Sequence, residues 1–534
     1  MTASQTRSRQ SDPAPTAPGH SWHRPAPSSW RAALTPERVV LLVVLVVYAV
    51  KGLALVDIHP PFSGHDEVAH YAYISTIVTQ GRIPLIPDPD MWAAPGTVAD
   101  PADFDRISSY FWGYCRYSTQ DWSGCGDNQC PDSCYLHVDA ATGIIMPAGW
   151  IYTANHPPLY YLLMVPIFWA TDTHWPEDQL PWFRRAAIPF GLATVLLSYL
   201  IVRQLVPGRG PSARFLALTV PAIVAFQPQV SYEAAMLNND IMAIALTSTV
   251  IWLTTIGIRH DFRIRTSVLI GFVLGLALLT KTTAITVVPI IAVGMILTCG
   301  WRTWRGRHGW VTHGAIAAGV AVLTCWPWYA YMWQRYGDFN ALARIRRLQW
   351  WNYENEPVPT ILSQLTDRAF FWRILEQTFG GFGWHLIPLS DGFKTVLAAL
   401  FIVGIAGLSL YTIRVYAGTS PTGVIEGWRA HPRVRRIALG GVDRRQVIGL
   451  AAMGAMVVVS YAALLQFGTQ FQGTQARYAF PAVIPAAILL GIGVEGWVPQ
   501  RWLRWLAVVV IAGMIFLNVW IYWRYVFPWL DARP

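Results

Sequence analysis

Residues 39–56 read VVLLVVLVVYAVKGLALV, and residues 64–73, a few positions later, read GHDEVAHYAY. The first stretch is almost wholly apolar and approaches the roughly 20 residues that a helix needs to cross a bilayer. The second places two adjacent carboxylates, Asp66 and Glu67, where the chain leaves that helix. Ionisable groups are costly near lipid, so they are typical of functional positions. Together the two stretches predict a membrane protein with a polar site at one face of the bilayer.

The composition favours a membrane protein over a nucleic-acid-binding one. Hydrophobic residues make up 54% and charged residues 13% of the chain, which is typical of a protein with many spanning helices. The formal net charge is +10, but Lys and Arg fall in short clusters between apolar runs, as the positive-inside rule predicts. We therefore expect the basic residues to orient the chain in the cell membrane, and we expect no nucleic-acid partner.

Apolar runs of about spanning length recur along the chain. They cover residues 39–57, 186–206, 213–230, 240–258, 267–280, 284–299, 311–333, 392–413, 447–466, 479–497 and 505–527, and a shorter run covers 159–170. If the N-terminal tail and all the basic clusters are cytoplasmic, the number of crossings is consistent only when the short run does not cross. We therefore predict an all-α polytopic fold with about 11 transmembrane helices, within a range of about 10–13.

The same reasoning divides the chain. Residues 1–36 are rich in Pro, Ser, Thr and Arg and have little to bury, so they are predicted to form a disordered, basic, cytoplasmic tail. Residues 37–527 are predicted to form the transmembrane domain, followed by a short C-terminal tail over 528–534. Within the domain, 58–185 is predicted to be a large first extracytoplasmic segment and 334–390 a second extracytoplasmic loop.

Four of the six cysteines lie close together in the first extracytoplasmic segment: Cys115, Cys125, Cys130 and Cys134. Such spacing fits either two disulfides in an oxidising compartment or a zinc site. No pair has the Cys-x-x-Cys spacing that is frequent in zinc sites, so the pattern favours disulfides. Their connectivity is open.

Asp66 and Glu67 have two interpretations. They are either solvated acids of a loop, or a working pair that the helix predicted over 68–78 docks against the membrane surface. In the second case one carboxylate is a general base and the other orients a hydroxyl or binds a metal. His65 and His70 are five residues apart, which does not fit the i, i+4 spacing of a zinc-protease motif. His70 would instead orient Asp66 or serve as a structural histidine.

Three further positions on the predicted outer face carry charge. Asn239 and Asp240 open an apolar run, as helix N-caps do, but they would also suit a metal or a sugar. Lys281 separates two apolar runs, and Arg477 precedes another. Each is either a snorkelling side chain or a cation that holds a lipid phosphate.

The 334–390 loop contains the sequence FGGFGWH at residues 379–385, which includes Trp384. Interfacial aromatic belts explain many such residues without any ligand. Aromatic faces also stack on sugar rings, and the glycines would allow a mobile or closely packed segment over a site. The loop alone does not decide between these interpretations.

Taken together, these elements resemble the GT-C class of membrane glycosyltransferases, close to the protein O-mannosyltransferase and aminoarabinose-transferase type and to related uncharacterised bacterial membrane proteins. The resemblance rests on the order of motifs over about residues 39–497: Asp66-Glu67, Asn155-His156-Pro157-Pro158-Leu159-Tyr160-Tyr161, Asn238-Asn239-Asp240, Lys281, Phe382-Gly383-Trp384 and Gln475-Ala476-Arg477-Tyr478. The cysteine-bearing insertion is not part of the general pattern.

The resemblance implies an inverting transferase that moves a sugar from a polyprenyl-phosphate donor to a hydroxyl of a cell-envelope protein, lipid or polysaccharide, on the outer face of the membrane. The catalytic candidates are Asp66, which would activate the acceptor, and Glu67. Asp240 matches a second acidic position, and Asp66 and Asp240 leave a divalent metal open as a cofactor. The substrate-binding candidates are His70, His156, Asn239, Asp240, Lys281, Trp384, Arg477 and Tyr478.

Two other functions use the same residues. A transporter or flippase for a lipid-linked or anionic solute would employ the outer charges as a binding site. The absence of an internal sequence repeat and the large polar outer segments favour an enzyme acting at one face. The other alternative is a catalytically inactive relative that serves as an interaction platform.

Overall fold

The computed structural model describes residues 35–87, 136–138, 145–147, 151–348, 358–383, 385, 387–417, 443–471 and 474–532. Most of the predicted N-terminal tail, all four clustered cysteines and Trp384 lie outside the described residues. The predictions made for them therefore stay predictions.

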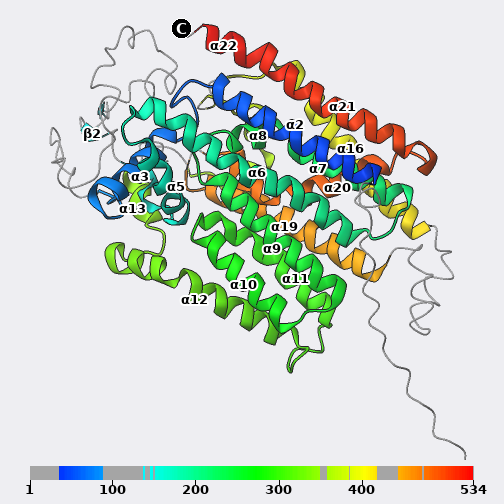
Figure 1. The fold of residues 1–534 in the computed structure, drawn as a ribbon. Helices are drawn as coiled ribbons and strands as arrows, with labels where there is room; N and C mark the ends of the chain where they lie inside the picture. The colour runs from blue at the N-terminus through cyan, green and yellow to red at the C-terminus, as the bar shows by residue number, and fades with distance from the viewer. Residues whose placement is uncertain are drawn as a thin grey trace, which may run out of the picture.

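Long helices that run along a common direction build the molecule (Figure 1). Within the described residues, nine helices are long and apolar enough to cross a membrane. They are Pro36–Ile58 (α2), Pro176–Leu205 (α6), Asp240–His260 (α9), Thr282–Cys299 (a 3₁₀ turn, Thr282–Val287, and α11, Val288–Cys299), Trp310–Tyr336 (α12), Asp391–Ile413 (within α16, Asp391–Ala417), Arg444–Gly468 (α19), Ala476–Glu495 (a 3₁₀ turn, Ala476–Ala482, and α20, Val483–Glu495) and Gln500–Asp531. The last combines a 3₁₀ turn (Gln500–Trp502), α21 (Leu503–Ile521), a π-turn (Tyr522–Val526) and α22 (Phe527–Asp531).

Two of the eleven predicted spans are not among these nine helices. The run over 213–230 folds as α7 (Pro211–Phe226) and α8 (Pro228–Ala234), which are bent by 61° at Gln227 and count as a tenth span if taken together. The run over 267–280 folds as α10 (Ile264–Leu278), which has 15 residues and is shorter than a typical span. The prediction of a polytopic helical membrane protein is confirmed, and each predicted span corresponds to a helix or a helix pair.

The shorter elements surround one end of the long helices (Figure 1). The short run at 159–170 is α5 (Leu159–Thr171), whose first N–H donates to Leu279 O at the end of α10. Its 13 residues are fewer than the roughly 17 that a spanning helix needs, and the prediction that it does not cross the membrane stays a prediction. The remaining short helices are α3 (Glu67–Gln80), α13 (Leu342–Leu348), α14 (Ile361–Thr366), α15 (Arg368–Gly380) and a 3₁₀ turn at Tyr152–Asn155, and two strands, β1 (Leu136–Val138) and β2 (Ile145–Pro147), form an antiparallel hairpin.

Local sequence explains where the spans begin and how closely they pack. Thr35 caps α2 by accepting from the Arg38 N–H, and Pro36 occupies the first helical position, where a missing N–H costs nothing. On α10, a Cβ added at Gly271 or Gly275 would run into α12, so these glycines permit the two helices to approach closely.

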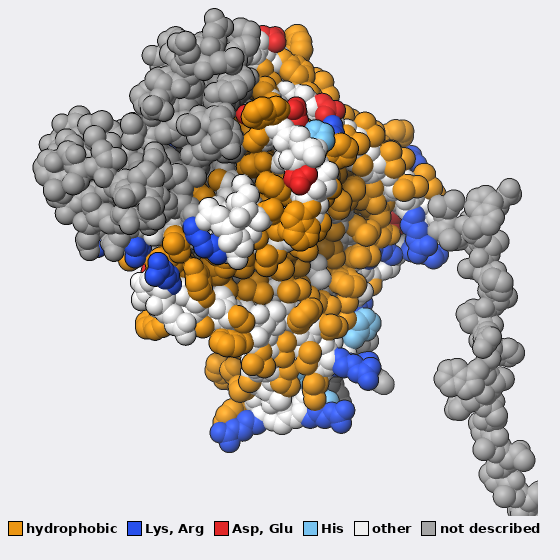
Figure 2. Space-filling view, turned by 60° about the vertical axis from the view of Figure 1, so that its left-hand side comes forward, with side chains coloured by type: hydrophobic (Ala, Val, Ile, Leu, Met, Phe, Trp, Pro, Cys, Tyr) orange, Lys and Arg blue, Asp and Glu red, His pale blue; other side chains and the backbone are white. Residues whose placement is uncertain are grey.

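Two apolar regions support the fold. The main core lies between the spanning helices, and a second core, which includes Phe62, Tyr73, Tyr160 and Tyr161, lies beneath α3 and α5. Hydrophobic side chains also cover most of the described surface in Figure 2, while Lys and Arg appear at its lower end and in small groups at its left and right edges. Large exposed residues such as Leu323 and Ile402 therefore face the position of the lipid.

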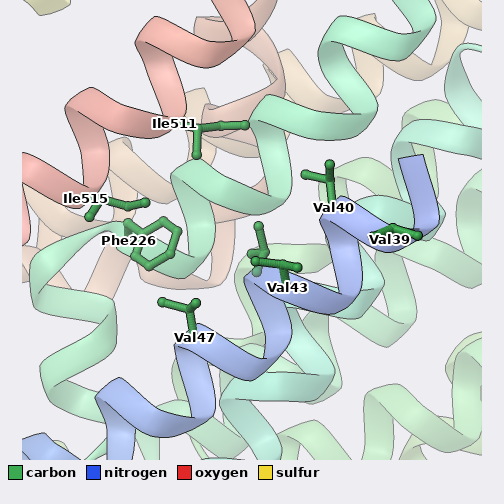
Figure 3. Close-up of a pocket in the computed structure, with 8 residues that line it drawn as sticks. Val39, Val40, Val43, Val47, Phe226, Ile511 and Ile515 are labelled. Carbon is green, nitrogen blue, oxygen red and sulfur yellow. The ribbon is translucent and has the colours of Figure 1, made fainter. Parts of the chain in front are cut away.

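An apolar cavity of about 160 Å³ lies between α2, α7 and α21 (Figure 3). Its lining includes Val39 and Val47 of α2, Phe226 of α7 and Ile511 of α21. Val47 precedes the end of α2 by 11 residues, which corresponds to roughly 16 Å along a helix. The cavity is therefore separate from the polar site described next.

Candidate active site

The candidate site forms where four spanning elements end or begin at the same end of the molecule. Asp66 follows α2, Asp240 is the first residue of α9, Lys281 follows α10, and Arg477 stands in the 3₁₀ turn before α20. Consecutive spans run in opposite directions, so every second helix end lies on the same side. These four positions can therefore lie on one face although they are far apart in the sequence. This is the convergence that the topology predicted.

Asp66 has a backbone conformation that sets it apart. Its φ of 59° lies in the left-handed region, which is uncommon for a residue other than glycine and is often found at functional positions. It occupies the N-cap position of α3 but makes no side-chain capping bond, so its carboxylate points elsewhere. With 18% of its side chain exposed, it is more accessible than Glu233 or Asp240, at 0% and 5%.

Two cations and two carboxylates form a continuous charged array. The Arg477 Nη2 donates to Asp66 Oδ2, and Arg477 Nη1 lies 3.5 Å from Asp240 Oδ2. Lys281 Nζ donates to Asp240 Oδ1 over 2.6 Å. The Lys281 ammonium also lies over the Tyr478 ring, 5.7 Å from its centroid. Asp240 thus joins the lysine to the arginine, and the arginine joins Asp240 to Asp66.

The array is buried, which strengthens its electrostatics. The side chains of Lys281 and Arg477 are only 7% and 4% exposed. Burial by itself would raise the pKa of Asp66, but the neighbouring Arg477 guanidinium is the main opposing influence, and the net effect is a pKa well below its usual range. Asp66 is therefore ionised in the free protein.

Glu67 lies outside this array although it is adjacent to Asp66 in the sequence. Its fully buried carboxylate accepts from Arg184 Nε over 2.8 Å and from Arg184 Nη2 over 2.6 Å. It also accepts from the Gly64 and Leu237 N–H groups, each over 2.9 Å. Arg184 further donates to carbonyl oxygens at the end of α2, so this pair ties α2, α3 and α6 together.

A second group of polar residues lies beside the array. His70 Nδ1 is 2.8 Å from the Tyr161 hydroxyl, which is 3.2 Å from His156 Nδ1. The Asn239 amide nitrogen is 3.3 Å from the same His156 nitrogen. Burial lowers the pKa of His70 to about 3 and that of His156 well below its usual value, so both imidazoles are neutral near neutral pH. These contacts connect α3, α5 and α9.

Sequence reasoning missed Glu233, a fully buried acid in α8. It accepts from Gln229 Nε2 over 2.9 Å and from Asn238 Nδ2 over 3.0 Å, and Arg477 Nη1 lies 4.0 Å away. His65 Nδ1 lies 3.6 Å from Glu233 Oε1. The signal was available: Gln227-Pro228 interrupts an apolar run, and irregular backbone at membrane depth is typical of a site.

The structure brings most of the predicted residues together. Asp66, His70, His156, Asn239, Asp240, Lys281, Arg477 and Tyr478 all belong to the array or to the group beside it. Trp384 and the four clustered cysteines lie outside the described residues. Within the described part of the chain, no group of three or more His, Cys, Asp or Glu side chains is arranged to hold a metal ion. Asp66 and Asp240 direct oxygens at Arg477 and Lys281 instead.

Part of the chain matches a known family. Residues 177–328, less than a third of the chain, match the family described as dolichyl-phosphate-mannose-protein mannosyltransferase. This confirms the predicted resemblance to GT-C class membrane glycosyltransferases. The matched segment carries Asp240, Lys281 and Glu233, but not Asp66 or Arg477. No curated protein matches the chain.

Several solved structures are similar in fold. ArnT from Cupriavidus metallidurans bound to undecaprenyl phosphate is 14% identical, with a TM-score of 0.46 over 90% of this chain and 70% of that one. The Archaeoglobus fulgidus oligosaccharyltransferase in complex with Zn and sulfate is 13% identical, with a TM-score of 0.46 over 89% of this chain. The match spans 52%, about half, of that enzyme.

Proposed function

We propose that this protein is an inverting glycosyltransferase that moves a sugar from a polyprenyl-phosphate donor to a hydroxyl of a cell-envelope acceptor, on the outer face of the cell membrane. The observation that carries the proposal is the buried array Asp66–Arg477–Asp240–Lys281, at one end of the spanning helices. The family match over residues 177–328 supports it.

The array has the groups that such a reaction needs. As the sugar leaves its carrier, negative charge develops on the phosphate and must be stabilised by cations in a site that excludes water. Lys281 and Arg477 supply two buried cations. Arg477 Nε and Nη1 have no hydrogen-bond acceptor among the described residues, so donors are in place for an incoming phosphate oxygen.

Asp66 is the general base in this proposal. Inversion requires the acceptor hydroxyl to attack from the side opposite the leaving phosphate, with a base that removes its proton. Asp66 is ionised, partly exposed and joined to the phosphate-binding arginine, whereas Glu233 and Asp240 are more deeply buried. We assign Glu67 to holding the segment in place, because Arg184 and two N–H groups occupy both of its oxygens.

A transporter or flippase is less well supported. Such a protein would use the charged array only as a binding site, and the matching family consists of transferases. No step of the proposed mechanism is routed through a metal, because the oxygens of Asp66 and Asp240 are directed at cationic side chains.

The test is transfer of a radiolabelled sugar from a polyprenyl-phosphate donor to cell-envelope material by the purified protein in liposomes. Loss of a positioned base costs about 10²- to 10⁴-fold in rate, so Asp66→Asn should lose most turnover but keep donor binding. Asp57→Asn is the matched control, because Asp57 is 67% exposed and pairs with Arg185 outside the array. Near-normal transfer by Asp66→Asn would show that the base lies elsewhere, with Glu233 or Asp240 as the next candidates.

The cations are tested in the same assay. Lys281→Ala and Arg477→Ala should raise the donor KM, lower kcat, or both, because each removes a buried donor to the phosphate. Lys394→Ala is a control, since Lys394 pairs with Glu376 and Asp391 away from the array. Unchanged donor kinetics in both array variants would contradict the phosphate assignment.

The proposed orientation has its own test. Cysteines introduced singly at Asp172 and Arg209, both exposed, lie at opposite ends of α6. A membrane-impermeant thiol reagent should label the first in intact cells and the second only after lysis. The opposite pattern would place the array on the cytoplasmic side and rule out an extracytoplasmic acceptor.

A further inference from the structure

The connection between α11 and α12, Gly300–Gly309, is a loop held by its own hydrogen bonds. The Thr303 N–H donates to Gly300 O over 2.9 Å, and the Trp310 N–H donates to Thr303 O over 3.2 Å. The Trp310 indole Nε1 donates to Trp301 O over 3.2 Å, and the rings of these two residues stack with their centroids 5.6 Å apart. The start of α12 therefore holds the loop, which presents its side chains in a defined arrangement.

Three arginines of this loop have no acid to balance their charge. Arg302, Arg305 and Arg307 are exposed, and none of them forms an ion pair with a residue that the structure describes. The Arg305 guanidinium lies over the Trp304 ring, 3.7 Å from its centroid. Stacking of this kind uses the face of the guanidinium and leaves the N–H groups at its edge available to an acceptor.

The acids at this end of the molecule are already engaged. Within the described residues, each has a partner outside the loop: Asp261 with Arg445, Asp443 with Arg259, Glu37 with Arg203 and Glu495 with Ser212. The loop therefore differs from the neighbouring helix ends, where arginine and carboxylate neutralise each other. The described part of the chain supplies no counter-charge for the three loop arginines.

The loop and the charged array lie at opposite ends of the spanning helices. Lys281 of the array immediately precedes the span Thr282–Cys299, and Gly300 immediately follows it. The 18 residues of this span cover roughly 27 Å along a helix, which is close to the thickness of the hydrocarbon layer. An anion bound at the loop is thus separate from the substrates of the array.

The neighbouring apolar residues place the loop at the depth of the lipid headgroups. Leu297 of α11 and Val311 of α12 are exposed apolar residues, and both lie within about one helical turn of the loop. Trp301 and Trp304 are 70% and 45% exposed, and tryptophan favours the boundary between lipid and water. The arginines therefore stand where lipid phosphates lie, rather than far out in bulk water.

We propose that the Gly300–Gly309 loop binds the headgroup phosphate of an anionic glycerophospholipid, in the membrane leaflet opposite the array. Arg302, Arg305 and Arg307 donate to the phosphate oxygens, and the exposed tryptophans pack against the adjoining part of the lipid. A nucleic acid or an acidic protein would approach from bulk water and would leave those tryptophans without an apolar partner. The inference does not depend on the proposed sugar transfer.

The test measures lipid binding by the full-length protein in neutral detergent micelles. Phosphatidylglycerol, or phosphatidylcholine with the same acyl chains, is titrated in, and bound lipid is counted by native mass spectrometry. We expect tighter binding of phosphatidylglycerol, weakening as salt is raised. An arginine near an anionic surface contributes a factor of about five in affinity, so the triple variant Arg302→Gln/Arg305→Gln/Arg307→Gln should lose on the order of 10²-fold in affinity for phosphatidylglycerol. Its thermal midpoint without added lipid should not change.

A matched triple variant separates the loop from general surface charge. Arg209→Gln/Arg501→Gln/Arg504→Gln removes the same charge from exposed positions at the same end, in or beside the connections that follow α6 and α20. This variant should keep its affinity for phosphatidylglycerol within a few-fold. Equal losses in the two triple variants, or equal binding of the two lipids by the wild type, would overturn the proposal.

Competition identifies the occupant. Soluble glycerol phosphate, a single-stranded oligonucleotide and polyglutamate should each fail to displace phosphatidylglycerol from the wild-type protein at equal concentration. Displacement by glycerol phosphate would show a site for free phosphate instead of lipid. Displacement by the oligonucleotide or by polyglutamate would show a surface for a soluble polyanion, and either result would refute a lipid site.

Discussion

Replacing Glu67 by Gln should destabilise the protein far more than its single change of atom suggests. Each Glu67 oxygen accepts two hydrogen bonds: Oε1 from Arg184 Nε and the Leu237 N–H, and Oε2 from Arg184 Nη2 and the Gly64 N–H. Whichever oxygen becomes NH₂, two buried donors then face a third donor. Breaking a buried, hydrogen-bonded ion pair in this way costs about 3–5 kcal/mol.

Glu67→Gln would leave the Arg184 guanidinium buried without a carboxylate partner. Its side chain is fully buried and would retain only the carbonyl oxygens of Val56, His59 and Pro60, at 3.3, 2.5 and 2.9 Å. Neutral acceptors satisfy its hydrogens but do not balance its charge. A double variant, Glu67→Gln with Arg184→Met, removes the stranded charge and should be more stable than Glu67→Gln alone.

The assay is the unfolding free energy in mixed detergent micelles, with the thermal midpoint as a second measure. Asp57→Asn is the control, because its partner Arg185 is 37% exposed and a pair of this kind contributes about 1 kcal/mol or less. If Glu67→Gln were as stable as Asp57→Asn and yet lost all transfer, Glu67 would be a catalytic residue and the structural assignment would be refuted.

Two further predictions concern the same segment. Gly64→Ala should lower the free energy of unfolding by about 1–3 kcal/mol, since an added Cβ would lie 2.5 Å from Glu67 Cδ. Gly314→Ala is the control and should not destabilise the protein, because an added Cβ there has no atom within 4 Å. Equal melting temperatures for the two variants would contradict this prediction. Burial lowers the pKa of His59, His65 and His70 to about 3 from an ordinary value of 6.5. As the pH falls, these histidines are protonated in the unfolded chain before they are protonated in the folded protein. Stability should therefore fall as the pH decreases from 6.5 towards 3, and these histidines should not change it above 6.5. His70→Asn should reduce the slope of the thermal midpoint against pH.

Much of the site could be predicted because it depends on where charges interrupt apolar runs. Asp66, Asp240, Lys281 and Arg477 each stand next to a spanning stretch, and the parity of the spans is enough to place them on one face. Which of them touch could not be predicted. Helix order does not specify which helix ends are neighbours, and the contact between Arg477 and Asp66 joins residues 411 positions apart.

The same limit explains why the sequence grouped Glu67 with Asp66 and why it did not show where Glu233 would lie. Adjacent residues in the sequence point in different directions once a helix begins, so Asp66 faces Arg477 while Glu67 faces Arg184. The bend between α7 and α8 is what brings the Glu233 carboxylate to within 4.0 Å of Arg477 Nη1. The local sequence does not predict whether the side chain of an acid at the end of an apolar run will be buried in the protein.

The sequence by itself determined the class of the protein, the approximate spans and the set of polar residues at one end, because hydrophobic length and charge placement are local quantities that a bilayer selects directly. The tertiary structure decided the partners: the Glu67–Arg184 pair, the array from Asp66 to Lys281, and the contacts of the Tyr161 hydroxyl with His70 and His156. These depend on the packing of helices distant in sequence, and a buried polar group takes whichever partner that packing brings within hydrogen-bond reach.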